Sequence, residues 1–153
     1  MPEPSYTYNC KITRVVDGDT FDTLIALGFN ISHTGRVRML GIDTPESRTR
    51  NLKEKQLGLA SKQFLKDKIA EAPITSGKRR RDIMIKTTKE GRGKFGRILA
   101  TLYVGGVDIN QLMIDAGHAR PYFGGKKNLL GPWVKEISSE WQRWTKNGYV
   151  SME

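Results

Sequence analysis

Two runs of β-forming residues, separated by a tight turn, constrain the fold of this chain most strongly. Residues 6–16 (YTYNCKITRVV) are rich in Tyr, Thr, Val and Ile, and residues 20–27 (TFDTLIAL) alternate apolar and polar side chains. Between them stands DGD (17–19), and Asp-Gly is a common hairpin signal. A third run, RVRML (36–40), follows soon after. The beginning of the chain therefore predicts a three-stranded antiparallel meander and not a β-α-β unit.

The rest of the chain alternates between helical and strand-like patterns. We expect helices over 52–70, 107–119 and 133–144, and strands over 80–88 and 97–104. In the first helix the residues expected to share a face are Leu52, Leu59, Phe64, Leu65 and Ile69. In the second, Asp108 is placed to cap the N-terminus, with Gln111 three residues later and Gly117 at the C-terminal stop.

This order of elements predicts a mainly β fold with helices, an α+β arrangement. Five strands with a helix between the third and the fourth are compatible with a five-stranded OB-fold β-barrel carrying three helices. Other α+β sheets fit the same order. With 153 residues, the chain is expected to form one domain over residues 1–153.

The formal charge of +10 is the strongest signal in the composition. Such a charge attracts polyanions, and nucleic acid is the usual partner. A basic surface that only keeps a small protein soluble is the alternative. The basic stretch 77–82 has the same two interpretations, a polyanion contact or a solvated loop. The stretch 121–127 combines aromatic residues with lysines, which suits base stacking and backbone contacts; the alternative is that Tyr122 packs its ring and exposes its hydroxyl to water.

The cellular location is expected to be cytoplasmic. The chain has one cysteine, Cys10, in a strand-like context that favours a buried small side chain, so no intramolecular disulfide can form. No apolar run approaches the roughly 18–20 residues that span a membrane, and the N-terminus lacks the pattern of a signal peptide. A signal removed before residue 1 is the alternative.

Two acids flank a turn that follows the third strand directly, in GIDTPESR (41–48). Asp43 stands where this strand ends, and Asp19 stands where the second strand begins. A meander can bring both to one end of a sheet. Together with the carbonyl oxygen of Thr44, they would supply part of the oxygen shell that Ca²⁺ prefers. Taken separately, each stretch is also an ordinary turn or helix-start signal.

Two arginines add a feature suited to phosphate. Arg38 lies in an alternating strand with apolar neighbours, and Arg97 precedes another strand. The planar guanidinium fork matches a phosphate, although a simple pair with a carboxylate is the alternative for either arginine. With a metal site and the spare carboxylate of Glu46, the set matches the needs of phosphodiester cleavage: charge neutralisation, transition-state stabilisation and proton transfer from water.

Four stretches of the chain resemble the staphylococcal (micrococcal) nuclease-like, or thermonuclease, family. They are VVDGDTF (15–21), VRMLGIDTPES (37–47), EKQLGLASKQFL (54–65) and the long stretch from GKFGRIL to GHARPY (93–122). They occur in the family's order with plausible spacing, and the tail beyond residue 122 matches less well. The resemblance implies an OB barrel with three helices. It also implies Ca²⁺-dependent hydrolysis of DNA and RNA, with little sequence preference, that leaves 3′-phosphate and 5′-hydroxyl ends. We expect the protein to be a monomer.

The resemblance also implies individual roles. Asp19, Asp43 and the Thr44 carbonyl match the calcium ligands, and Asp17 matches a nearby acid that supports them. Arg38 and Arg97 match the phosphate-binding arginines, and Glu46 matches the carboxylate that acts as general base or positions water. Lys94 and Tyr122 match residues that contact the substrate.

The chain departs from the family pattern at two of the matched positions. Phe95 replaces a tyrosine whose hydroxyl contacts a phosphate, so that contact is missing. Ala60 replaces a glutamate of a structural charge network.

A binding module that holds nucleic acid without cutting it is the alternative function. Degenerate domains of this family usually lose the arginines or the acids, and this chain retains Asp19, Arg38, Asp43, Glu46 and Arg97. A basic structural protein would explain the charge but not this set of residues.

Overall fold

The computed structural model describes residues 5–74, 81–92 and 96–122, with the backbone alone for residues 89–92. In chain order the elements are β1 (Thr7–Asp17), β2 (Thr20–Gly28), β3 (Ile31–Met39), β4 (Ile42–Asp43), α1 (Leu52–Ala70), β5 (Ile83–Arg92), β6 (Ile98–Val104), β7 (Val107–Asp108), α2 (Ile109–Asp115) and β8 (Arg120–Pro121).

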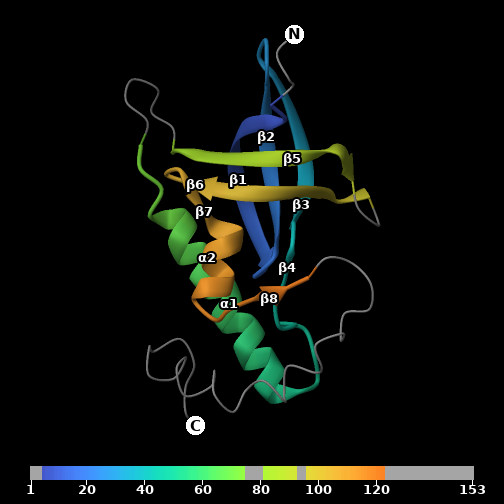
Figure 1. Ribbon diagram of the computed structural model, residues 1–153, viewed down its shortest axis with the longest axis vertical. Helices are drawn as coiled ribbons and strands as arrows, with labels where there is room; N and C mark the ends of the chain where they lie inside the picture. The colour runs from blue at the N-terminus through green and yellow to red at the C-terminus, as the bar shows by residue number, and fades with distance from the viewer. Residues whose placement is uncertain (1–4, 75–80, 93–95, 123–153) are drawn as a thin grey trace.

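Five long strands close into a barrel (Figure 1). The strands β1, β2 and β3 form the expected antiparallel meander, β5 pairs with β1, and β6 pairs with β5. The barrel closes where β6 runs parallel to β3, with Val37 opposite Ile98 and Met39 opposite Ala100. This OB-like barrel with two helices confirms the predicted fold class. The third expected helix, 133–144, lies outside the described residues.

The third strand is longer than the sequence indicates. It begins at Ile31, because Phe29 and Asn30 take positive φ angles of 54° and 63° and turn the chain within two residues. Positive φ at both central positions is the geometry of the tightest hairpin turns, and Gly or Asn normally supplies it. Because Phe29 occupies the first of these positions, the sequence does not indicate the turn.

Helix α1 has the predicted bounds, but its buried face differs from the prediction. Asn51 caps it by accepting a hydrogen bond from the Glu54 backbone N–H. Leu57, Phe64 and Leu65 are buried, whereas Leu52 and Leu59 are 74% and 47% exposed. At 100° per residue, Leu57, Phe64 and Leu65 share one face, and Leu52 and Leu59 fall on the opposite side.

Helix α2 is shorter than predicted at both ends: residues 107–108 form the short strand β7, and the helix ends at Asp115, two residues before Gly117, whose φ is 80°. The predicted cap is confirmed, since the Asp108 side chain accepts a hydrogen bond from the Gln111 backbone N–H. Inside this helix, the buried Asn110 side chain donates to the carbonyl groups of Leu40 and Ala100 and accepts from Leu102 N–H. The amide therefore ties the chain leaving β3 to β6.

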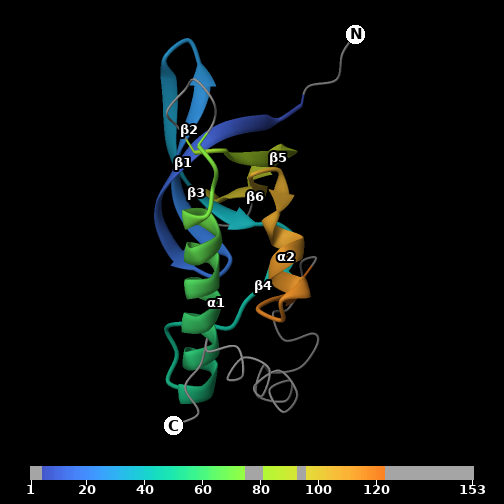
Figure 2. The same cartoon turned by 90° about the vertical axis from the view of Figure 1, so that its left-hand side faces the viewer.

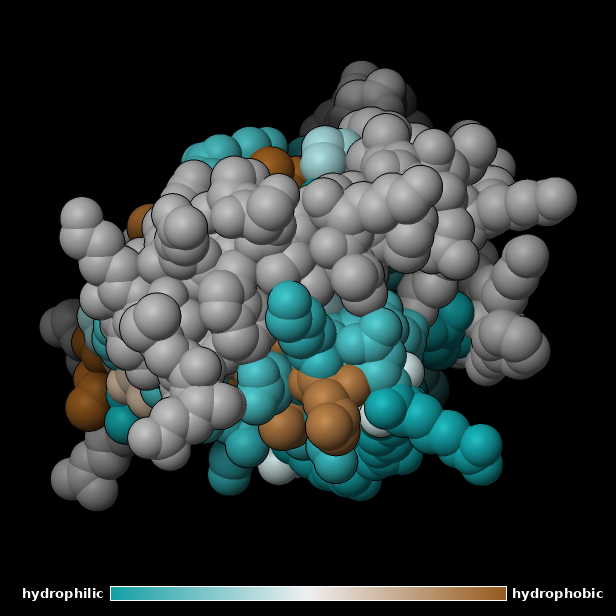
Figure 3. Space-filling view, turned by 90° about the horizontal axis from the view of Figure 1, so that it is seen from below, coloured by the Kyte–Doolittle hydropathy of each residue, from teal (hydrophilic) through white to brown (hydrophobic). Residues whose placement is uncertain are grey.

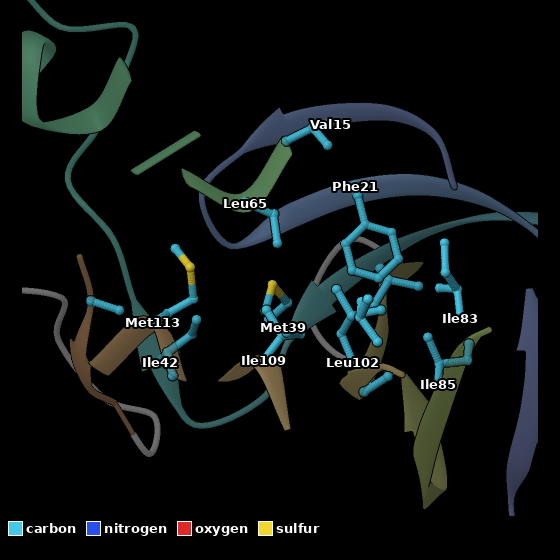
Figure 4. Close-up of a cluster of buried hydrophobic side chains, with 14 of the residues drawn as sticks. Val15, Phe21, Met39, Ile42, Leu65, Ile83, Ile85, Leu102, Ile109 and Met113 are labelled. Carbon is cyan, nitrogen blue, oxygen red and sulfur yellow. The ribbon is translucent and has the colours of Figure 1, made fainter. Parts of the chain in front are cut away.

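The core fills the barrel and continues between the barrel and the two helices (Figure 4). Phe21, Ile85 and Leu102 project inward from three strands and are fully buried. Leu65 from α1 and Met113 from α2 extend this cluster. Each such side chain contributes about 1.5–3 kcal/mol of burial free energy, so the helices are held firmly against one end of the barrel.

Both helices lie at the lower end of the barrel in Figures 1 and 2. Seen from below, the described surface of this end is mainly hydrophilic, with a compact hydrophobic cluster (Figure 3). Within the described ranges, no helix combines the length and the apolar character needed to cross a membrane.

Candidate active site

Arg38 is buried although it points away from the core. Its neighbours Val37 and Met39 are 0% and 1% exposed, so the alternation of β3 directs Arg38 to the outer face of the barrel wall. Arg38 itself is only 8% exposed. Its Nη1 donates to the Met39 carbonyl at 3.1 Å, and its Cζ lies 5.9 Å from the centre of the Tyr122 ring. The guanidinium group is thus fixed in a covered position.

Asp19 is held by neighbouring segments on several sides. Its carbonyl oxygen accepts a 2.7 Å hydrogen bond from Met39 N–H, which anchors the β1–β2 turn to β3. Its carboxylate accepts the Thr20 hydroxyl at 2.9 Å and the Thr44 backbone N–H at 3.2 Å. These contacts fix the side chain between β3 and the segment that follows it.

Gly18 allows this turn to pack closely against its neighbours. A Cβ atom at residue 18 would lie 2.8 Å from Ser61 Cβ and 3.1 Å from Thr44 Cγ2. Any side chain at residue 18 would therefore collide with Ser61 and Thr44, and glycine avoids this.

Asp43 comes from the short strand β4, which pairs with β8. The pairing sets Asp43 opposite Arg120, and Arg120 Nε lies 3.6 Å from Asp43 Oδ2. Asp43 and Arg120 are 1% and 7% exposed. A second hydrogen bond, from Tyr122 N–H to the Gly41 carbonyl, supports the same strand pair.

The two carboxylates meet at Arg38, as the meander predicted. Arg38 Nη1 lies 3.3 Å from Asp19 Oδ2, and Nη2 lies 3.8 Å from Asp43 Oδ1. All three side chains are at least nine-tenths buried. Two buried carboxylates repel each other unless a cation lies near both, and Arg38 supplies that positive charge here. We call Asp19, Arg38, Asp43 and Arg120 the acid–arginine cluster.

Glu46 lies in the loop between β4 and α1, three residues after Asp43. The Ser47 hydroxyl donates a short hydrogen bond to Asp17, which ties this loop to the end of β1. On the other side, the backbone of Glu46 and Ser47 lies directly against Gly58 of α1. The Glu46 side chain is half-buried. The backbone at Glu46 is therefore held between β1 and α1, which fixes the point from which its carboxylate extends.

The chain belongs to a known family, shown by a match between residues 36–129 and a family model. That model describes the staphylococcal nuclease homologues, and the match covers more than half of the chain. This protein is a staphylococcal nuclease homologue.

Similar proteins come from bacilli and staphylococci. The chain is 29% identical over 150 residues to an uncharacterized protein of Bacillus anthracis, covering 94% of this chain and 64% of that protein. It is 29% identical over 149 residues to the SPbeta prophage-derived endonuclease YokF of Bacillus subtilis, covering 92% of this chain and 45% of that protein. It is 28% identical over 132 residues to the thermonuclease of Staphylococcus intermedius, covering 86% and 70%. The chain thus spans less than two thirds of the first two relatives.

The donor set of this staphylococcal nuclease homologue fits a hard divalent cation. Asp19 and Asp43 bring two carboxylates to one place, and the Thr44 backbone is held beside them by its N–H, which donates to Asp19. Within the described ranges, no group of three or more His, Cys, Asp or Glu side chains is suited to hold a metal. A cation bound here would therefore take most of its ligands from water, which Ca²⁺ and Mg²⁺ accept.

The structure describes only some of the other predicted site residues. Tyr122 is half-buried beside Arg38, so the structure brings it to the cluster. Arg97 is half-buried directly before β6, whose Leu99 lies beside Arg38 in the parallel pairing. Lys94 and Phe95 lie outside the described residues.

Sequence reasoning missed Arg120, Ser47 and Gly58. Arg120 follows a helix and looks like one more basic residue, and only its register opposite Asp43 reveals its role. Gly58 looks like a mild defect inside a helix. An available signal was the glycine inside the helix, because glycine permits the close approach of another backbone segment, and the DTPE stretch ends twelve residues earlier.

A second arginine–carboxylate pair lies outside the cluster. Arg36 Nε and Nη2 donate to the two Asp22 oxygens at 2.7 and 3.2 Å, directly across β2 and β3. The hydrogen bond from Arg36 lowers the pKa of Asp22. The pair is solvent-exposed, so it contributes little to stability.

We predict that Gly58→Ala destabilises the protein although alanine favours helices. A Cβ at residue 58 would lie 2.5 Å from the Glu46 carbonyl and 2.6 Å from the Ser47 nitrogen, and backbone atoms cannot rotate away. We expect a loss of about 1–3 kcal/mol in the free energy of unfolding, measured by urea titration. Leu59→Ala, at an exposed neighbour, should change stability by no more than about 0.5 kcal/mol. A Gly58→Ala protein more stable than wild type would show that the loop does not pack on this helix.

Proposed function

We propose that this protein is a metal-dependent nuclease that hydrolyses DNA and RNA without sequence preference and leaves 3′-phosphate and 5′-hydroxyl ends. We propose Ca²⁺ as the metal, although another divalent ion can take its place, and a monomer as the active form. The observation that carries the proposal is the meeting of Asp19 and Asp43 on Arg38. The relatives named endonuclease and thermonuclease support the same class of reaction.

The arginines bind and stabilise the phosphate in this proposal. Arg38 is held in place by the Met39 carbonyl and Tyr122, so little reorganisation is needed when a phosphate arrives. Arg38 then interacts less with the two carboxylates and more with the phosphate oxygens, whose negative charge increases in the transition state. Arg97 is proposed as the second phosphate ligand. Lys94 and Tyr122 are proposed to contact the neighbouring parts of the substrate.

Glu46 acts on the attacking water molecule in this proposal. As water oxygen bonds to phosphorus, Glu46 accepts its proton or orients the molecule for attack. The P–O5′ bond breaks, and its electron pair leaves with O5′, which takes a proton from solvent. The products are a 3′-phosphate and a 5′-hydroxyl.

Asp19, Asp43 and the Thr44 carbonyl would hold the cation, supported by Asp17 through Ser47. When bound, the ion supplies positive charge next to the phosphate and helps to place water. Arg120 stays against Asp43 and keeps this carboxylate oriented.

The test is cleavage of single-stranded oligonucleotides, plasmid DNA and RNA with Ca²⁺, with Mg²⁺ and with a chelator, followed by end-group analysis. We expect metal-dependent cutting, strongest with Ca²⁺, and 3′-phosphate ends. Tight binding without cutting under any of these conditions would instead identify a binding module.

Matched variants separate the cluster from the rest of the surface. Asp19→Asn should abolish most of the metal-dependent activity, because it removes a proposed ligand. Asp22→Asn makes the same chemical change at an exposed pair outside the cluster and should leave cleavage within about twofold of wild type. Equal losses in both variants would contradict the assignment of the metal site.

A further inference from the structure

A concave surface lies along the C-terminal half of α1, which is the upper half in Figures 1 and 2. It is a groove of ≈ 960 Å³ between this half of the helix and the β1–β2 face of the barrel, and strand β1 lines it from Asn9 to Val15. The helix and this strand lie next to each other in Figures 1 and 2. At about 3.3 Å per residue, this part of β1 is roughly 20 Å long. The groove therefore has room for an extended chain.

Basic side chains from both walls surround the groove. Lys11 and Arg14 come from β1, and Lys62 and Lys66, one helical turn apart, come from α1. Arg81 also lines it, but its Nη1 donates to the Ala70 and Ala72 carbonyls at the end of the helix. Among the described residues that line the groove, none is acidic. The groove is thus a concentrated positive surface.

The three lysines of the groove are not paired with acids in the described part of the chain. Within the described part of the chain, the Lys11, Lys62 and Lys66 side chains form neither an ion pair nor a hydrogen bond. Three acids near the groove have other partners: Asp22 binds Arg36, Asp67 accepts a hydrogen bond from Gln63, and Glu71 pairs with Lys68. Asp82, between Arg81 and Ile83, does not line the groove. A free anion is therefore the partner that these lysines can accept.

The floor of the groove is apolar. It includes Ile12 and Val15 from β1, Ile69 from α1 and Ile83 from β5. Cys10 also lies there, half-buried, and burial raises the pKa of its thiol. An apolar floor between basic rims suits a ligand with flat apolar faces along an anionic backbone, which describes single-stranded nucleic acid. In a duplex the bases are stacked inside and cannot reach the floor.

The groove ends close to the acid–arginine cluster. Val15, at its lower end, is two residues from Asp17, which anchors the Glu46 loop through Ser47. Lys62 directly follows Ser61, which packs against Gly18 in the turn that presents Asp19. A strand held at the cluster can therefore continue past this turn into the groove.

We propose that the α1–β1 groove is a second binding site for single-stranded nucleic acid, which holds the segment of a strand next to the one at the cluster. Lys11, Arg14, Lys62 and Lys66 contact the phosphates, and the apolar floor receives bases. The choice of ligand rests on the proposed nuclease function. Binding by the groove does not depend on cleavage, so the two can be tested separately.

The first test measures binding of labelled single-stranded oligonucleotides of about 3 and about 12 nucleotides by fluorescence anisotropy, in a chelator and at several salt concentrations. The variant Lys62→Ala/Lys66→Ala is compared with Lys68→Ala/Lys86→Ala, whose side chains do not line the groove. Both variants lower the net charge from +10 by two, to +8.

We expect the groove variant to bind the longer oligonucleotide about tenfold more weakly or worse. We also expect its slope of log affinity against log salt to fall by about 1.4, that is, about 0.7 for each lost phosphate contact. The control should change affinity by less than about threefold. Equal weakening in both variants would overturn the proposal, because net charge alone would then explain binding. The proposal would also be overturned if the groove variant lost as much affinity for the 3-nucleotide ligand, or for a 12-base-pair duplex, as for the 12-nucleotide single strand.

The second test uses Cys10 as a reporter on the floor of the groove. Since it is the only cysteine of the chain, alkylation by a small maleimide reports on this place alone. Bound 12-nucleotide single strand should abolish most of the alkylation in wild type, and Lys62→Ala/Lys66→Ala should lose this protection. An unchanged alkylation rate under saturating oligonucleotide would overturn the proposal. Protection by an acidic peptide or by anionic vesicles, but not by the oligonucleotide, would assign the groove to another partner.

Discussion

Glu46→Gln is expected to lower the rate of phosphodiester cleavage by about 10²–10⁴-fold, the usual contribution of a positioned general base. Glutamine keeps the shape of the side chain but cannot accept the proton of the attacking water. The loop should stay in place, because Ser47 still binds Asp17 and the backbone still packs on Gly58. The loss should therefore appear in kcat much more than in KM.

The measurement is single-turnover cleavage of a defined oligonucleotide with Ca²⁺ at several pH values. Glu71→Gln, at the far end of α1, removes the same charge and serves as the matched control. Its cleavage rate should stay within about twofold of wild type, because Glu71 is exposed and its carboxylate pairs only with Lys68 in the described structure. A Glu46→Gln enzyme that cuts at nearly the wild-type rate would remove Glu46 from the mechanism.

Arg38→Lys is expected to slow cleavage by about 10²–10³-fold while the protein stays folded. Lysine keeps a positive charge near Asp19 and Asp43, but its point charge lacks the planar fork that binds two oxygens at once. The loss should appear in kcat/KM, and circular dichroism should show the wild-type fold. Arg36→Lys, at the exposed pair with Asp22, is the matched control and should retain activity. Equal activity of Arg38→Lys and wild type would show that the arginine is structural only.

Arg38→Ala is expected to be much less stable than Arg38→Lys. It leaves Asp19 and Asp43 buried without their shared cation, and removing one partner of a buried ion pair costs about 3–5 kcal/mol. For a chain of 153 residues this corresponds to a drop in Tm of roughly 6–20 °C. Ca²⁺ should recover part of the loss if it binds the same two carboxylates. Thermal melts with and without Ca²⁺ measure both effects, and a variant as stable as wild type would contradict the electrostatic role of Arg38.

The local sequence determined the individual elements and the short-range part of the site. Alternation along 6–16 and 20–27 predicted β1 and β2 to within a residue or two, because side chains in a strand point to opposite faces in turn. The bounds of α1 and the Asp108 cap of α2 were likewise readable from periodicity and capping. Arg38 and Asp43 are five residues apart, on a strand and just after its end, so only a short turn is needed to bring them together.

Only the tertiary structure decided which distant residues meet. The parallel pairing of β3 with β6 closes the barrel, and no local pattern encodes it, because it joins segments about sixty residues apart. The β4–β8 register likewise sets Arg120 against Asp43, and the packing of α1 explains why residue 58 is glycine. The α1–β1 groove arises where two surfaces meet, so its five basic residues look unrelated in the sequence. Local sequence fixes backbone conformation and side-chain alternation, whereas such contacts depend on how the closed barrel and its helices pack as a whole.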